Sequence, residues 1–157
     1  MRRLFKKFSL KINLSIVASI ISSISIIASA FIGKNESIDK AIQVIFPLVF
    51  WIGLIAEQVF IWNANSIRNK LEAEGKLRRI RGKPGVLSIL QTEEGAITDL
   101  ILILSVIAFV ILLLFGIGKG FVQYLFIFLI VLSFRLHCIF DGKNFRYKKY
   151  LAKRKVD

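Results

Sequence analysis

The sequence predicts an all-α fold: a polytopic integral membrane protein whose four transmembrane helices form one bundle. Hydrophobic residues make up 55% of the chain and the mean hydropathy is +0.66. A soluble domain of 157 residues could not bury that much apolar surface. The net charge of +13 lies in short basic segments between long uncharged runs, which is typical of a multi-pass membrane protein. Without repeats or linkers, residues 1–157 form a single domain.

Four apolar segments each have the ~20 residues that an α-helix needs to cross a ~30 Å hydrocarbon core. We predict spans over about residues 12–32, 41–64, 96–117 and 121–140, with a basic loop at 65–95 and a basic tail at 141–157. Helices satisfy every backbone polar group within lipid. The alternating ten-residue strands of a membrane barrel are absent from the sequence.

The basic residues predict the orientation. The segment before the first span, the 65–95 loop and the chain from Arg135 onward contain 20 of the 23 Lys and Arg residues. The positive-inside rule therefore predicts a cell-membrane protein with both termini and this loop in the cytoplasm. A rival interpretation of the first span is a signal peptide cleaved near Ala28–Ala30, but its apolar run is longer than usual for one.

Small residues recur on one face of the first span, at spacings of three and four. Such a face lets two helices approach closely in lipid, where apolar burial drives association only weakly. We predict a helix-packing face, within the bundle or against a second copy, and a polar pathway is the alternative. Its residues are Ser15, Ala18, Ser22, Ser25 and Ser29.

Ionisable side chains inside the spans indicate a buried polar site, because charge at membrane depth is costly. Glu57 lies roughly 24 Å and Arg135 roughly 21 Å from the outer edge, counting 1.5 Å per residue. An intramembrane Glu57–Arg135 ion pair is the hypothesis that follows, and an uncharged, protonated Glu57 is the alternative.

The helical wheel separates Arg135 from His137 by about 200°, so they cannot both face one neighbour. If Arg135 faces Glu57, His137 faces another helix or the headgroups, and Asp99 is a candidate partner. The reverse assignment, with Arg135 reaching lipid phosphates, is nearly as good. The predicted intramembrane polar site comprises Glu57, Gln58, Asp99, Arg135, His137 and Asp141, although Asp99 and Asp141 also suit the headgroup level.

The sequence offers little for an enzyme. We find no Gly-rich phosphate loop, no paired-histidine metal motif and no nucleophile with a spaced base. Cys138 and His137 are adjacent, so their side chains point about 100° apart on a helix. A single His and a single Cys cannot build a zinc site of four Cys or His ligands. We therefore predict no catalytic residue, metal or cofactor.

We predict a small non-catalytic membrane component: a subunit, an accessory protein or an immunity-type protein that binds a partner or lipid. It would act within a homo-oligomer or a membrane complex. Its basic cytoplasmic face attracts anionic headgroups, through Arg78, Arg79, Arg81, Lys83, Lys148 and Lys149. No nucleic-acid reader motif accompanies the charge, so we expect no nucleic-acid partner.

Two other functions are kept open. One is an oligomeric small-solute or proton-coupled transporter that uses Glu57. The other is a membrane-embedded, lipid-modifying enzyme that uses Glu57, His137 and Asp141.

Overall fold

The computed structural model describes residues 2–32, 40–75, 92–116 and 120–153, and this part of the chain is helical. Its five helices are α1 (Arg2–Ile32), α2 (Lys40–Ala73), α3 (Glu93–Phe115), α4 (Phe121–Phe140) and α5 (Lys143–Lys153). The predicted all-α class is confirmed. As predicted, four of the helices, α1 to α4, are long and apolar enough to cross a membrane.

Two helices are longer than the predicted spans: α1 begins earlier, at Arg2, and α2 ends later, at Ala73. α1 has 31 residues and α2 has 34, which corresponds to roughly 46 Å and 51 Å at 1.5 Å per residue. A ~30 Å hydrocarbon core accommodates only part of each. The basic start of α1 and the basic last turns of α2 therefore continue the helix beyond the apolar layer.

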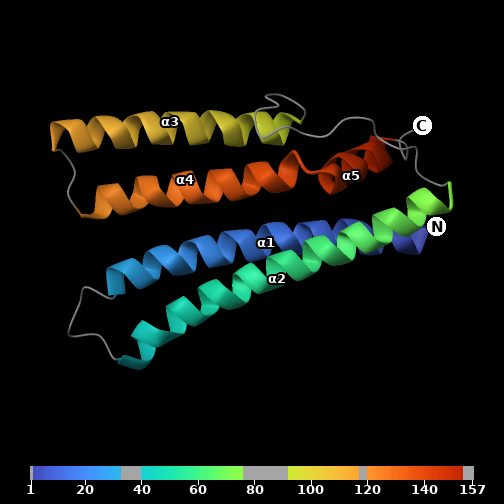
Figure 1. Ribbon diagram of the computed structural model, residues 1–157, viewed down its shortest axis with the longest axis horizontal. Coiled ribbons are helices and arrows are strands. Elements are labelled where there is room, and N and C mark those ends of the chain that lie inside the picture. Colours follow the sequence, from blue (N-terminus) through green and yellow to red (C-terminus); the bar gives the residue numbers. More distant parts are fainter. Residues whose placement is uncertain (1, 33–39, 76–91, 117–119, 154–157) are drawn as a thin grey trace.

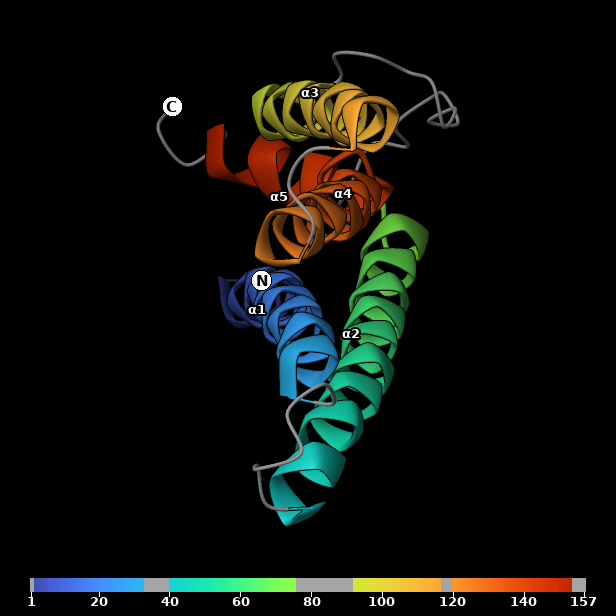
Figure 2. The same ribbon diagram turned by 90° about the vertical axis from the view of Figure 1, so that its left-hand side faces the viewer.

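The long helices pack in the order α3, α4, α1, α2 (Figures 1 and 2). α1 packs against both α2 and α4, while among the described helices α3 packs on α4 alone. These contacts form a row of neighbours, and closure into a bundle stays a prediction.

One end of the molecule gathers most of the described basic residues. α1 and α3 begin there, α2 and α4 end there, and α5 lies beside them (Figure 1). We call this the basic end. With an even number of spanning helices, both ends of the chain lie on the same side of the membrane. That the basic end faces the cytoplasm stays a prediction.

The buried apolar core lies at the basic end rather than half-way along the long helices. α5 supplies two of its aromatic side chains and thereby joins α1 and α2, although the sequence indicated only a basic tail there. The core consists of Phe8, Ile12, Ala64, Leu71, Phe145 and Tyr147. Water reaches the ends of membrane helices, so apolar burial stabilises this region as it does a soluble protein.

Polar contacts also hold α5 in place. Lys148 Nζ donates to Asn13 Oδ1 at 2.6 Å, and Arg68 Nη1 donates to Asn144 Oδ1 at 2.9 Å. Lys149 lies 2.5 Å from Glu94 of α3, and this hydrogen bond raises the pKa of Lys149. α5 thus connects the α1–α2 pair to the α3–α4 pair.

Half-way along α2, Gly53 allows close approach to α1. A Cβ atom at Gly53 would lie 2.6 Å from Cβ of Ser22 and 3.3 Å from the carbonyl oxygen of Ala18. Real Cβ atoms essentially never come within 3.0 Å of another atom, as this one would of Ser22 Cβ, and the contact with the Ala18 oxygen would also be tight. Both neighbouring atoms are fixed to the backbone of α1, so they cannot move away by side-chain rotation. The small-residue face of α1 therefore packs against a glycine of α2.

We predict that Gly53→Ala destabilises the protein. Overpacking costs about 1–3 kcal/mol, against about 0.8–1 kcal/mol that alanine gains in helix propensity. The clash involves a Cβ and a backbone oxygen, so we expect the upper part of the first range and a net loss. Unfolding in mixed micelles titrated with sodium dodecyl sulfate measures it. Ser66→Thr adds one methyl group at an exposed position of α2 and serves as control; equal stability of Gly53→Ala and wild type would contradict the prediction.

Candidate functional site

The first buried polar cluster surrounds Arg135 of α4. Its Nη2 forms an ion pair with Oε2 of Glu57 on α2. Its Nη1 donates to the hydroxyls of Ser22 and Ser23 on α1, at 2.7 Å and 3.0 Å, and to the carbonyl oxygen of Ser19 at 3.3 Å. One guanidinium therefore contacts two other helices.

Two serine hydroxyls of α1 are oriented to accept hydrogen bonds from Arg135. Ser22 and Ser23 donate their own hydroxyl protons to the carbonyls of Ala18 and Ser19, each at 2.8 Å. Their oxygen lone pairs then face the guanidinium. A hydroxyl that donates to its own helix and accepts from a cation is satisfied in both directions.

Burial makes this cluster structurally important. The Glu57 side chain is 7% exposed and that of Arg135 is 12% exposed. An uncompensated charge at such a site is strongly destabilising, whereas a paired and hydrogen-bonded one is tolerated.

The predicted packing face is largely buried in the structure. Ser15, Ala18, Ser22 and Ser25 are buried, and Ser29 is partly exposed. The sequence argument missed Ser19 and Ser23, which are fully buried. The available signal was the regular step of four residues from Ser15 to Ser19 and from Ser19 to Ser23. Only the position of Arg135 shows what these two serines do.

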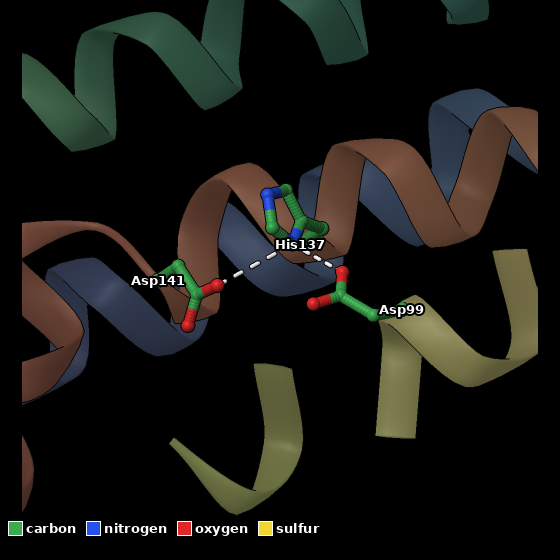
Figure 3. Close-up of side chains that lie close together, drawn as sticks. All are labelled: Asp99, His137 and Asp141. Atoms are coloured by element: carbon green, nitrogen blue, oxygen red, sulfur yellow. Dashed lines mark ion pairs between the residues drawn. The ribbon is translucent and has the colours of Figure 1, made fainter. Parts of the chain in front are cut away.

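The second polar cluster lies between α3 and α4, at the basic end. His137 Nδ1 is 2.5 Å from Oδ1 of Asp99 and 3.4 Å from Oδ2 of Asp141. Figure 3 shows the imidazole nitrogen between the two carboxylates. Each of the three side chains can offer one ligand atom to a metal ion.

The remaining predicted residues lie elsewhere. Gln58 is exposed on α2 and belongs to neither cluster. Lys148 and Lys149 are engaged by Asn13 and Glu94, and burial lowers the pKa of Lys148. The other proposed lipid contacts lie outside the described residues: Arg78, Arg79, Arg81 and Lys83.

A cavity of 290 Å³ opens at the basic end between α1, α2, α4 and the start of α5. Ile12, Ile61, Ala64 and Ile139 form much of its apolar wall. Polar side chains also line it, namely Ser15, Asn65, Arg68, Lys143 and Asn144. Such a mixed lining suits a molecule with both a charged and an apolar part.

The chain was compared with protein families, curated proteins and solved structures. None of them matches it. The two clusters and the cavity are therefore the basis on which we infer a function.

We predict that Glu57→Gln lowers the free energy of unfolding by about 3 kcal/mol, because it leaves the Arg135 charge buried without its counter-ion. The double variant Glu57→Gln/Arg135→Gln removes both charges and should recover most of the loss. Unfolding in mixed micelles measures both variants.

Glu72→Gln is the matched control. Glu72 also pairs with an arginine, at 3.5 Å from Arg68 Nε, but as an (i, i+4) pair near the surface. Such a pair contributes only about 0.3–0.5 kcal/mol. If Glu57→Gln behaves like Glu72→Gln, the Arg135 cluster does not hold the helices together.

Proposed function

We propose that the protein is a non-catalytic membrane component that binds anionic lipid headgroups in the cavity at its basic end. The observation that carries the proposal is that one cavity is lined by two basic residues, Arg68 and Lys143, and by an apolar wall. An arginine fork matches two phosphate oxygens, and a lysine adds a second positive charge. The apolar wall then accommodates the adjoining part of the lipid.

The position of the cavity also supports this function. It lies where the apolar spans give way to basic segments, which is the depth of headgroups in a bilayer. Orientation by the positive-inside rule would place it at the cytoplasmic leaflet, where anionic lipids are concentrated.

Hydrogen bonds to two asparagines fix the position of the Arg68 guanidinium beside the cavity. Asn144 accepts from Nη1 at 2.9 Å and Asn69 accepts from Nη2 at 3.2 Å. The Nε atom is buried and forms no hydrogen bond among the described residues, although Glu72 lies within ion-pair distance. A phosphate oxygen would complete the hydrogen bonding of the guanidinium.

Transport through Glu57 has less support. Glu57 is neutralised by Arg135, whose other nitrogen is bound by Ser22 and Ser23. Each transport cycle would have to break these bonds inside the membrane. The lipid-modifying enzyme also has less support, because the His137 Nδ1 atom is already paired with Asp99 and lies within ion-pair distance of Asp141.

We predict that Arg68→Gln/Lys143→Gln weakens the binding of phosphatidylglycerol relative to phosphatidylcholine. Each near-surface basic residue contributes about 1 kcal/mol, so losing two corresponds to roughly 30-fold in affinity. Native mass spectrometry of the full chain in mixed micelles measures the bound lipid.

Two further variants sharpen this test. Lys6→Gln/Lys7→Gln removes two exposed charges from the start of α1 and controls for general surface charge. Lys143→Gln alone leaves the Arg68–Asn144 bond intact, so it separates lipid binding from the docking of α5. Equal retention of both lipids by the wild type, or an equal loss in the Lys6/Lys7 variant, would contradict the proposal.

A further inference from the structure

The Asp99–His137–Asp141 cluster contains more negative charge than its own residues can neutralise. Two carboxylates approach one imidazole, which supplies at most one positive charge. Arg146 is near, but it donates to the backbone carbonyl of Asp141, at 2.9 Å and 3.1 Å. Lys149 is engaged by Glu93 and Glu94.

One carboxylate oxygen of this cluster, Asp141 Oδ2, is buried and not hydrogen-bonded among the described residues. His137 is 8% exposed and Asp141 is 3% exposed. His137 Nδ1 is paired with Asp99 Oδ1 at 2.5 Å. Asp141 Oδ2 forms no hydrogen bond among the described residues and lies 3.4 Å from His137 Nδ1. Buried polar atoms in this state are uncommon and call for a missing partner, such as an ion.

The surrounding backbone is shaped to bring Asp141 into the cluster. Thr92 caps α3 by accepting from the amide of Gly95 at 3.0 Å, and its hydroxyl lies 3.5 Å from Asp141 Oδ1. A Cβ atom at Gly95 would collide with the Asp141 carboxylate. The first turn of α3 thus leaves room for this carboxylate at the end of α4.

The distances between the three potential ligand atoms would suit a metal ion after small movements of the side chains. The three potential ligand atoms lie within 4.8 Å of one another. Tetrahedral ligands at 2.0–2.2 Å from a cation are about 3.4 Å apart. Figure 3 shows that the three side chains converge on one point from two helices.

We propose that Asp99, His137 and Asp141 bind one divalent transition-metal cation, Zn²⁺ or Mn²⁺, between α3 and α4. Two carboxylates and a neutral imidazole balance a charge of +2. The imidazole favours these ions over Mg²⁺ and Ca²⁺, which prefer oxygen ligands alone. The prediction of no metal site considered only sets of Cys and His, and did not cover a site with two carboxylates.

Such an ion would fix the position of α3. Among the described helices α3 packs on α4 and is otherwise joined only to α5, by the Lys149–Glu94 ion pair. Ligands on both sides of the α3–α4 contact would join these two helices directly. Three protein ligands also leave a coordination position for water or for another group. None of these three residues lines the proposed lipid cavity, although their chain neighbours Cys138 and Gly142 do.

The test is metal binding by the full chain in detergent, purified without a polyhistidine tag because such a tag binds the same ions. After dialysis against ZnCl₂ or MnCl₂, elemental analysis should give one Zn²⁺ or Mn²⁺ per chain. The bound ion should raise the unfolding temperature. A hundredfold excess of Mg²⁺ should not displace it.

Asp99→Asn should weaken binding at least tenfold and abolish the thermal shift. Asp99 is the more exposed carboxylate, with 15% side-chain exposure, so this variant is the one best suited to fold. Glu94→Gln is the matched control, since Glu94 lies in the first turn of the same helix and pairs with Lys149. It should bind as the wild type does.

Three outcomes would overturn the proposal. The first is a wild-type chain that binds neither ion in stoichiometric amount, which would leave a metal-free His–Asp ion pair. The second is equal binding by Asp99→Asn and Glu94→Gln, which would indicate surface association. The third is displacement by Mg²⁺, which would contradict the transition-metal assignment.

Discussion

The guanidinium of Arg135 is the group on which the arrangement of three helices depends. It contacts Glu57 on α2 and the serines of α1 at once, so α4 cannot shift along either neighbour without breaking several bonds. Charge inside a membrane is costly unless partners surround it. That cost is what makes the cluster specific, because few other registers of the helices would pair both charges.

The two ends of the molecule are held by different forces. Within the spans, apolar side chains face lipid as readily as one another, so helix contacts use glycine, serine and the Arg135 network. Gly53 against Ser22 is one such contact. At the basic end, water is present, and the aromatic side chains of α5 complete an apolar core. α5 is therefore as much a part of the fold as the spans.

The cavity and the His137 cluster, from which the binding proposals are drawn, both lie at the basic end. The cavity with Arg68 and Lys143 lies between α1, α2, α4 and the start of α5, and the Asp99–His137–Asp141 cluster lies between α3 and α4. α5 connects these two halves through Lys148 and Lys149. Binding at either place would therefore act on the same short helix.

The sequence by itself determined the helical class and the four spanning segments, because long apolar runs have only one stable backbone form in lipid. The sequence also showed that Glu57 and Arg135 lie at a similar depth in the membrane, because depth along a helix follows from the number of residues. It could not choose between Arg135 and His137 facing the α1–α2 pair, nor find the helix in the basic tail. Both features depend on how each helix is rotated about its axis and on which helices lie next to it. Only the tertiary structure decided them, because each rotation is set by contacts between segments far apart in the chain, such as Ser22 with Arg135 and Asp99 with His137.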